Sequence, residues 1–269
     1  MKSTPLNIAD LSVSFQKQNA VQNLNVRVKK GKTTALVGES GSGKSVTAMA
    51  VLGLLPGYAT ITGDIEFENQ QLLALSNKSL RSIRGNKIGM IFQEPMTSLN
   101  PVFTIGEQIE EVVRLRKRIS RKNSKARTHQ LLQEVGISES RVNAYPHEFS
   151  GGMRQRVMIA MALANEPLLL IADEPTTALD ATTAKQIVAL LSEAKQRREM
   201  SMLFISHDLS LVSTVADEIC VMRFGRLVEY GTAKEVLCNP TTEYTSELLA
   251  CRPSITKRQG RLKTVITGI

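Results

Sequence analysis

A glycine-rich segment holds the residues with the clearest chemical potential. It fits the pattern G-x-x-x-x-G-K-[ST] and consists of Gly38, Glu39, Ser40, Gly41, Ser42, Gly43, Lys44 and Ser45. Glycines let successive backbone N–H groups turn toward one anion, and a helix that begins directly after them adds the positive end of its dipole. We therefore expect Lys44 to reach the β- and γ-phosphates of a nucleotide and Ser45 to ligate Mg²⁺. The alternative, a merely flexible glycine loop, does not explain why all the pattern positions are filled.

Two acids end an apolar run further along the chain. Residues 168–172 are all apolar, and Asp173 and Glu174 follow them directly. A buried parallel strand would place both carboxylates at the carboxyl edge of a sheet, where nucleotide sites form. We expect Asp173 to hold Mg²⁺, through water, and Glu174 to act as the general base on the attacking water. An acid pair that only ends a strand is the alternative, and the phosphate-binding loop disfavours it.

A third segment combines a serine with paired glycines at the predicted start of a helix. Ser150, Gly151 and Gly152 lie shortly before the apolar run and offer N–H groups to an anion. An ordinary helix cap would explain Ser150 but not the paired glycines. Two phosphate-binding helix starts in one chain indicate either two nucleotides or one nucleotide shared between chains.

Short apolar runs alternate with helical patterns, and these elements must position the three motifs. Strands are expected at 33–37, 63–67, 87–92, 168–172 and 202–205, and helices at 45–55, 104–137, 151–164 and 181–197. Residues 6–28 alternate as strands, and so do residues 215–235, with turns expected at Gly225 and Gly231. This order predicts a parallel α/β core, with the helical stretch from about 95 to 150 inserted as a subdomain.

Composition excludes several classes of protein. The chain has 269 residues, of which 42% are hydrophobic and 22% charged, so extensive disorder is excluded. Three cysteines, at 220, 238 and 251, fit neither a zinc site nor a disulfide framework, which favours a reducing compartment. No segment reaches the roughly 20 apolar residues that cross a bilayer, and the start of the chain lacks the apolar run of a signal peptide.

The net charge of +9 is confined to two clusters. Residues 114–127 contain eight basic residues and no acid, and residues 252–263 contain five more. The rest of the chain holds 21 basic against 25 acidic residues, a net charge of −4. A nucleic-acid surface spread over the chain is therefore not expected. The first cluster is predicted to be a solvated helix face or loop, and the alternatives are contact with anionic lipid or with the cytoplasmic loops of a permease.

Together the motifs resemble those of the ATP-binding-cassette ATPases, and the resemblance covers nearly the whole chain. Residues 38–45 match the Walker A motif, 149–153 the signature motif and 168–174 the Walker B motif. The resemblance implies an α/β fold: a P-loop NTPase (RecA-like) core with an N-terminal antiparallel β subdomain and an inserted α-helical subdomain. It also implies a nucleotide-binding domain over 1–255, followed by a basic tail or linker at 256–269.

The resemblance assigns further site residues for ATP and Mg²⁺. Gln93 resembles the Q-loop glutamine, which also ligates the metal, Asp180 the D-loop aspartate and His207 the switch histidine. Phe15 resembles the aromatic residue that stacks on adenine, and Val46 follows the Walker A motif. The signature residues Ser150, Gly151, Gly152 and Met153 are implied to bind the ATP of an opposite cassette, and Met153 departs from the family's usual glutamine.

Three segments narrow the resemblance to peptide and nickel importer ATPases. They are residues 93–101, 145–149 and 239–249, and they are most similar to the amino-terminal half of fused, double-cassette peptide importers. Several relatives carry a C-terminal cysteine cluster suited to an iron–sulfur centre. Cys251 stands alone, so no such centre is predicted.

The implied protein hydrolyses ATP to drive uptake of peptides or a related small solute through a membrane permease. Its implied partners are the permease subunits, a second cassette (identical, different or fused in the same chain) and, indirectly, a periplasmic or extracellular solute-binding protein. The implied location is peripheral, at the cytoplasmic face of a bacterial membrane, and no nucleic acid is expected. The rival readings are a cassette ATPase acting on ribosomes or DNA, a P-loop GTPase or kinase, and an inactive regulatory cassette.

Overall fold

The computed structural model describes residues 5–16, 18–93, 98–116 and 119–250. Two predicted features lie partly outside these residues. They are the importer-like segment 93–101, at positions 94–97, and the first basic cluster, at Lys117 and Arg118. Cys251 and the tail at 256–269 also lie outside the described residues.

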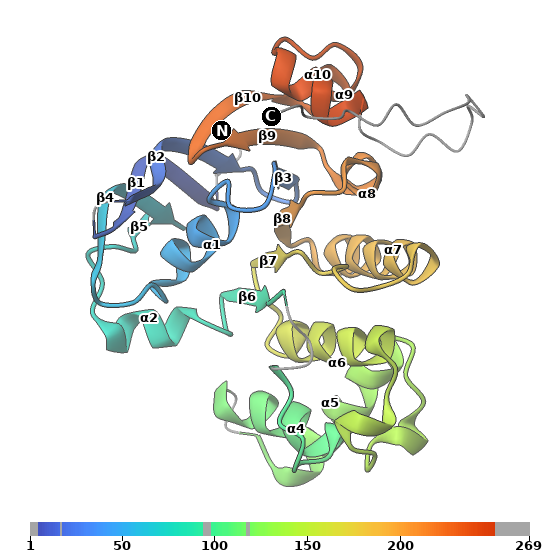
Figure 1. Cartoon of the computed structure of the whole chain (residues 1–269). Coiled ribbons are helices and arrows are strands. Elements are labelled where there is room, and N and C mark those ends of the chain that lie inside the picture. Colours follow the sequence, from blue (N-terminus) through green and yellow to red (C-terminus); the bar gives the residue numbers. More distant parts are fainter. Residues whose placement is uncertain (1–4, 17, 94–97, 117–118, 251–269) are drawn as a thin grey trace, which may run out of the picture.

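The chain forms two sheets, one antiparallel and one mainly parallel (Figure 1). The antiparallel sheet has the order β2-β1-β4-β5 and comprises β1 (Leu6–Phe15), β2 (Gln18–Val28), β4 (Ala59–Phe67) and β5 (Gln70–Gln71). Side chains of β1 and β2 alternate between buried and more exposed positions, because one face of this sheet packs on the core and the other faces solvent.

The second sheet forms the centre of the molecule and has the order β10-β9-β3-β8-β7-β6. Its strands are β3 (Thr33–Val37), β6 (Ile88–Ile91), β7 (Leu169–Asp173), β8 (Ser201–Ser206), β9 (Glu218–Arg223) and β10 (Arg226–Thr232). All neighbouring pairs are parallel except β9 and β10, which form an antiparallel hairpin. Every residue of β3, β7 and β8 is buried, which explains why these strands have apolar sequences without alternation.

Helices alternate with the strands along the described part of the chain. They are α1 (Lys44–Leu52), α2 (Asn77–Ile83), α4 (Ile105–Arg116), α5 (Arg121–Glu134), α6 (Gly151–Leu163), α7 (Ala181–Arg198), α8 (Leu209–Val215), α9 (Ala233–Cys238) and α10 (Glu243–Ala250), with short 3₁₀ turns at Glu139–Arg141 and Pro146–Glu148. One apolar cluster fills the space between the antiparallel sheet, α1 and the central sheet. A second joins the central sheet to α4, α5, α6 and α7.

Of the helices between β6 and β7, α6 packs on the central sheet, and α4 and α5 lie further from it (Figure 1). In Figure 1, α4 and α5 lie on the far side of α6 from the central sheet. The first basic cluster falls on the end of α4 and the start of α5, where Lys122 and Lys125 are exposed. Arg127 differs from the solvated face that we expect from the sequence, because its guanidinium pairs with Glu134 and Glu166 at 3.3 Å each.

The end of the chain that precedes α10 differs from its sequence pattern. Residues 233–238 are helical although strand-like alternation is expected up to residue 235, and Gly231 lies inside β10 opposite Ile219 instead of forming a turn; residues 209–215, for which the sequence makes no prediction before residue 215, are also helical. Both helices have side-chain caps: Asp208 accepts hydrogen bonds from the amides of Ser210 and Leu211, and Thr232 forms a capping box with Glu235. The turn expected at Gly225 is confirmed, with φ of 78°.

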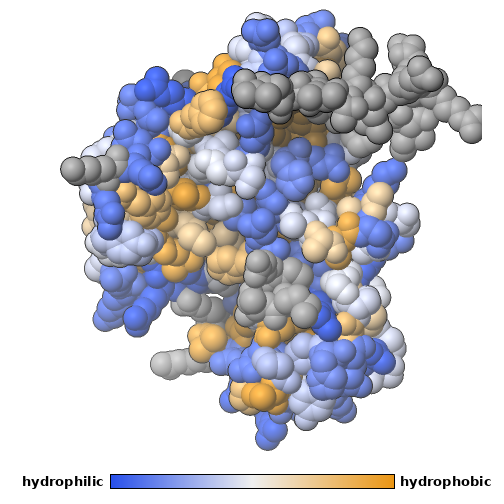
Figure 2. Space-filling view, viewed as in Figure 1, coloured by the Kyte–Doolittle hydropathy of each residue, from blue (hydrophilic) through white to orange (hydrophobic). Residues whose placement is uncertain are grey.

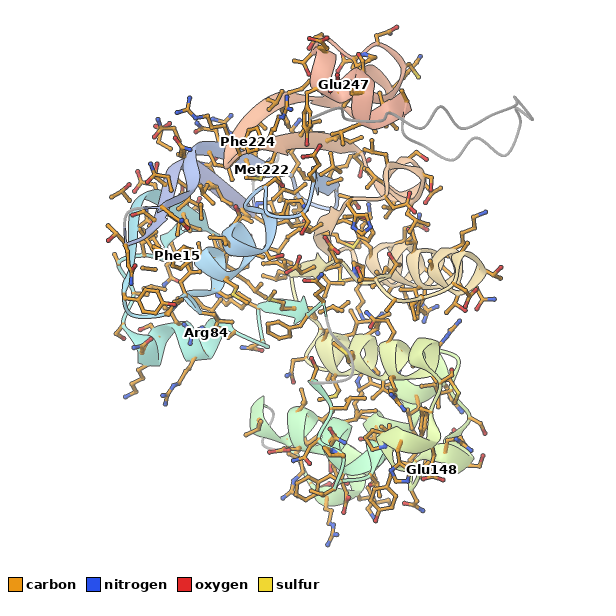
Figure 3. The ribbon with its side chains drawn as sticks, in the orientation of Figure 1. Phe15, Arg84, Glu148, Met222, Phe224 and Glu247 are labelled. Carbon is orange, nitrogen blue, oxygen red and sulfur yellow. The ribbon has the colours of Figure 1, made fainter. Side chains whose placement is uncertain are left out.

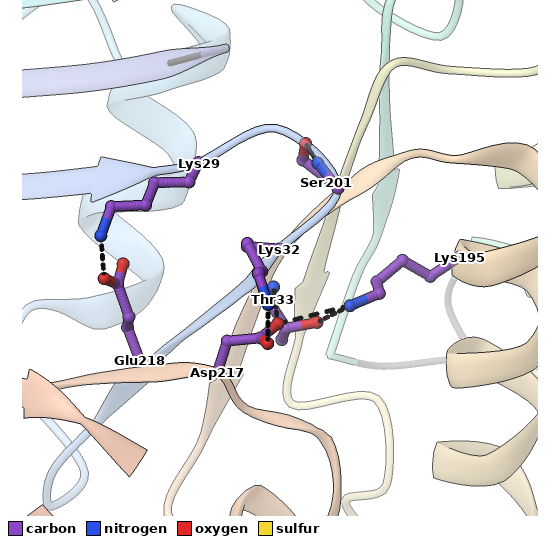
Figure 4. Close-up of polar contacts among 8 residues, drawn as sticks. Lys29, Lys32, Thr33, Lys195, Ser201, Asp217 and Glu218 are labelled. Atoms are coloured by element: carbon purple, nitrogen blue, oxygen red, sulfur yellow. Dashed lines mark hydrogen bonds and ion pairs between the residues drawn. The ribbon is translucent and has the colours of Figure 1, made fainter. Parts of the chain in front are cut away.

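Charged side chains pair at the amino-terminal edge of the central sheet (Figure 4). Asp217, just before β9, accepts hydrogen bonds from Lys32 Nζ and the Thr33 amide at 2.8 Å each. Lys195 of α7 lies 3.4 Å from the same carboxylate, and Lys29 pairs with Glu218. These contacts fasten the starts of β3 and β9 to α7.

No helix in the described part of the chain is both long and apolar enough to cross a membrane. Hydrophilic residues cover much of the face shown in Figure 2.

Candidate functional site

The phosphate-binding motif forms the turn between β3 and α1. Gly38 and Gly43 have φ of 150° and 100°, and Gly43 precedes the first residue of α1. A Cβ on Gly43 would lie 2.5 Å from the carbonyl oxygen of Ala20, and one on Gly38 would overlap the carbonyl oxygen of Met222. Both positions therefore need glycine, because the backbone is left-handed or closely packed there.

Lys44 lies inside this turn. Its ammonium donates to the carbonyl oxygens of Gly38 and Glu39 at 2.9 and 2.7 Å, and only 4% of the residue is exposed. Burial lowers the pKa of Lys44, and the negative charges of Glu174 and Asp173 partly oppose that shift. The loop thus holds the poorly hydrated ammonium group of Lys44 against its own backbone carbonyl oxygens.

Asp173 ends β7 next to the start of α1. Its Oδ1 accepts a hydrogen bond of 3.0 Å from the Ser45 hydroxyl, and the residue is 3% exposed. Burial raises the pKa of Asp173, while the Ser45 hydrogen bond opposes the rise. A hydroxyl and a carboxylate side by side are the hard oxygen ligands that Mg²⁺ prefers, and Mg²⁺ commonly takes only one or two protein ligands beside phosphate oxygens and water. Ser45 and Asp173 therefore fit the metal.

Three chain segments meet at Glu174: its own, which includes Thr177, the one with Gln93, and the end of β8 with His207. Its backbone N–H donates to Ile205 O at 2.9 Å, which ties it to β8, and its φ of 45° turns the chain away from β7. Its Oε2 accepts hydrogen bonds from Thr177 Oγ1 at 2.8 Å and from Gln93 Nε2 at 3.3 Å. His207 Nδ1 lies 3.3 Å from the same oxygen. The structure thus brings together three of the predicted residues, and it adds Thr177, which sequence reasoning missed.

A hollow of about 150 Å³ lies over the motif. It is lined by Ala20, Ser40, Gly41, Gly43, Lys44, Ser45, Val46, Gln93 and Glu174. Ala20 was not predicted, since nothing in its own sequence position marks it. Phe15 is not among the lining residues; it lies at the end of β1 (Figure 3), with its ring edge-on to Tyr58 at a centroid distance of 6.1 Å.

The signature segment caps α6, away from the residues that line this hollow. Ser150 accepts a hydrogen bond of 3.3 Å from the Met153 amide, and Gly151 is exposed. A Cβ on Gly152 would lie 2.5 Å from Cγ2 of Thr183 in α7, so the two helices meet closely at this glycine.

Asp180 caps α7 beside the signature segment. Its carboxylate accepts hydrogen bonds from the Thr183 hydroxyl at 2.6 Å and from the Thr182 and Thr183 amides at 3.0 and 2.9 Å. The hydrogen bond from the Thr183 hydroxyl contributes most to the lowered pKa of Asp180. Thr183 thus links the D-loop aspartate to the signature helix, and neither segment lines the hollow of its own chain.

Comparison with known proteins agrees with this geometry. Residues 21–177 match the family model described as ABC transporter. The chain is 52% identical to the peptidoglycan transport ATP-binding protein YejF of Agrobacterium fabrum over 256 residues, which is 92% of this chain and 47% of that protein. It is 48% identical to the oligopeptide transport ATP-binding protein OppD of Bacillus subtilis over 98% of this chain and 76% of that protein. The chain thus spans about half the length of the first relative.

A solved structure has the same fold. It is the dimeric, post-hydrolysis state of the ATP-binding cassette MJ0796 bound to ADP and Pi, with a TM-score of 0.76 and 27% sequence identity. The match covers 85% of this chain and 98% of that one. The family model and the relatives agree with the arrangement of β3, α1 and β7 around one hollow: the chain belongs to the ABC transporter family.

Proposed function

We propose that this chain is the ATP-hydrolysing subunit of an importer that takes up peptides, or a related small solute, through a membrane permease. The observation that carries the proposal is the convergence of Lys44, the Ser45–Asp173 pair and Glu174 on one hollow. The relatives, whose names include oligopeptide, dipeptide and glutathione transport or import, suggest the solute class. They favour import over action on ribosomes or DNA.

ATP binds with its phosphates over the amides of residues 38–46, where Lys44 contacts the β- and γ-phosphates. Phe15 stacks on the adenine. Ser45, Asp173 and Gln93 would hold Mg²⁺, which when bound would neutralise developing charge on the phosphate oxygens. Because burial lowers the pKa of Lys44, its ammonium is poorly hydrated and gains more from a phosphate than an exposed lysine would.

Glu174 orients the attacking water and accepts its proton. Thr177, Gln93 and His207 hold the carboxylate in place, because all three approach its Oε2. Hydrolysis then depends on positioning and charge stabilisation, as expected for phosphoryl transfer.

The site is completed by a second cassette. The Ser150–Met153 segment offers the amides of a helix start to an anion, yet it does not line the hollow of its own chain. In the proposed pair, this segment and Asp180 of one cassette face the ATP of the other. The dimeric state of the similar MJ0796 structure supports this arrangement. The cassette spans 1–255, with residues 95–150 as its helical subdomain, and acts at the cytoplasmic face of a membrane without nucleic acid.

The Glu174→Gln substitution tests the proposal. ATP affinity should stay within about twofold of the original, while turnover should fall about a thousandfold, because the proton acceptor is lost and the side chain's shape is kept. The measurements are equilibrium ATP binding and phosphate release. The matched control is Glu193→Gln on the exposed side of α7, which should hydrolyse ATP normally. Normal hydrolysis by Glu174→Gln would exclude Glu174 as the base.

Peptide import is tested separately by reconstitution with a permease and a solute-binding protein. Peptides should stimulate ATP hydrolysis, and nickel should not. Stimulation by nickel alone would change the proposed solute while leaving the ATPase assignment intact.

A further inference from the structure

The C-terminal helix α10 contacts the phosphate-binding loop from the side opposite α1. The residue that makes the contact is Tyr244, in the first turn of α10, which is 5% exposed. Its hydroxyl accepts a hydrogen bond of 3.4 Å from the backbone N–H of Glu39, 205 residues earlier in the chain. None of the sequence motifs predicts this contact, since it depends on how the end of the chain folds back.

The β9–β10 hairpin holds the tyrosine ring in place. The guanidinium carbon of Arg223 lies 4.4 Å from the centre of the Tyr244 ring and 5.2 Å from that of Phe224. Phe224 and its neighbour Met222 are labelled in Figure 3, where the hairpin lies below α10. A cation stacked on an aromatic face stabilises both groups. Arg223 therefore holds the Tyr244 ring in position independently of the Tyr244 hydroxyl.

The amide that Tyr244 contacts belongs to the same peptide group that binds Lys44. The carbonyl oxygen of Gly38 accepts from Lys44 Nζ at 2.9 Å, and the N–H of Glu39 donates to Tyr244. A peptide group is rigid and planar, and its C=O and N–H point in opposite directions. The Gly38–Glu39 peptide is therefore held at both ends, and a rotation that frees its N–H also moves the oxygen that carries the Lys44 ammonium.

Other parts of the loop have different supports. The amide of Gly225 donates to the Ser42 carbonyl at 3.1 Å, and the Met222 carbonyl packs against Gly38. These contacts restrain the loop backbone on either side of Glu39, whereas the hydrogen bonds of the Gly38–Glu39 peptide group itself go to Lys44 and Tyr244; Lys44 also donates to the Glu39 carbonyl oxygen at 2.7 Å.

We propose that Tyr244 is a positioning residue for ATP binding: its hydroxyl orients the Gly38–Glu39 peptide, and that peptide places the Lys44 ammonium for the β- and γ-phosphates. The inference rests on the proposed function of the site. Tyr244 does not touch the nucleotide, so it acts only through Lys44. Since Lys44 contacts the phosphates before and during the reaction, misplacing it weakens ground state and transition state alike, which raises KM and leaves kcat nearly unchanged.

Tyr244→Phe tests this inference, because it removes one oxygen and keeps the ring under Arg223. The dissociation constant and KM for ATP should rise about threefold, the size expected for the net loss of one hydrogen bond, with kcat within about twofold. The matched control is Tyr230→Phe on β10, whose hydroxyl interacts with Glu218 at the other end of the hairpin. Its ATP affinity and kcat should equal those of the original chain.

A second variant, Arg223→Gln, removes the cation that stacks on the Tyr244 ring. It should raise the ATP dissociation constant less than Tyr244→Phe does, and it should add nothing further in the double variant, because both changes act through one hydroxyl. Full additivity of the two changes would contradict the inference.

Two other results would overturn the role of Tyr244. One is an unchanged ATP dissociation constant in Tyr244→Phe. The other is a fall in thermal stability and kcat with no change in ATP affinity, which would mark the contact as structural only. A chain that binds ATP but does not hydrolyse it would contradict the proposed function alone, since the affinity comparison would still decide the role of Tyr244.

Discussion

The pKa values of charged side chains shift in opposite directions at the two edges of the central sheet. At the carboxyl edge, Lys44 and Asp173 are nearly buried, and burial dominates: it lowers the pKa of Lys44 and raises the pKa of Asp173. At the amino edge, pairing dominates. Burial opposes it there, yet hydrogen bonds from Lys32 and the Thr33 amide lower the pKa of Asp217, and the bond to Asp217 raises the pKa of Lys32.

This difference separates a functional edge from a structural one. At the carboxyl edge, burial disfavours the charged forms of Lys44 and Asp173, and pKa shifts of this kind are typical of residues that act on a ligand. Groups at the amino edge are charged and matched, so they stabilise the junction of β3, β9 and α7 (Figure 4). Substitutions at the first edge should therefore change activity, and those at the second should change stability.

Among the substitutions that compare the two edges, Asp173→Asn should give the largest effect. Phosphate release should fall about 100-fold, the size seen when a group that orients a bound metal is lost. The free energy of unfolding should stay the same or rise, because a neutral amide replaces a carboxylate whose ionised form is disfavoured by burial. Phosphate-release assays and urea unfolding measure the two effects.

Asp217→Asn is the reciprocal control, since it makes the same chemical change at the other edge. It should retain most of the ATPase activity. If it lost activity as severely as Asp173→Asn, the separation between the two edges would be wrong.

The sequence predicts the elements of the central sheet well, and the reason is their burial. The strand expected at 33–37 matches β3, and those expected at 168–172 and 202–205 match β7 and β8 to within one residue at each end. A strand covered on both faces is mostly apolar, so a short apolar run indicates where it lies, although β3 and β8 also bury small hydroxyl residues at their ends. The turn expected at Gly231 is wrong because that glycine pairs within β10, and nothing local distinguishes a paired glycine from a turning one.

Some residues of the site could be predicted from sequence motifs, and others could not. Gln93, Glu174 and His207 could be found from motifs, and the structure brings them together. Thr177 and Tyr244 could not be found, because their contacts depend on loop conformation and on the return of the C-terminal helix. A hydroxyl three residues after Glu174 was the only local signal for Thr177. The pairing of Arg127 with Glu134 could not be predicted either, because the segment 114–127 contains no acidic residue.

Asp217→Ala should lower the free energy of unfolding by about 2 kcal/mol, because it leaves the Thr33 amide without its acceptor and removes the charged partner of the mostly buried Lys195, which keeps the Thr33 hydroxyl as an acceptor. The pKa of Asp217 is lower in the folded chain than in the unfolded one. Its contribution is therefore complete above the unfolded value of roughly 4 and is lost as the pH falls through the folded value.

Urea unfolding at pH 7 and near pH 3 measures this dependence. The difference between Asp217→Ala and the original chain should be smaller at the acidic pH. A difference that grows on acidification would mean that the protonated carboxyl, not the carboxylate, is the stabilising form.

Lys29→Gln should give the smallest effect and so marks the outer limit of the paired edge. The lysine side chain is 56% exposed, although its partner Glu218 is only 11% exposed. An exposed cation contributes about 0.5 kcal/mol to such a pair, and that contribution should fall further in 0.5 M salt. A loss as large as that of Asp217→Ala, insensitive to salt, would show that Glu218 depends on Lys29 as a buried charge depends on its partner. In that case burial would disfavour the charged form of Glu218 at the amino edge, as it does for the charged groups at the carboxyl edge. The two edges would then differ only in how strongly burial acts on their charged groups.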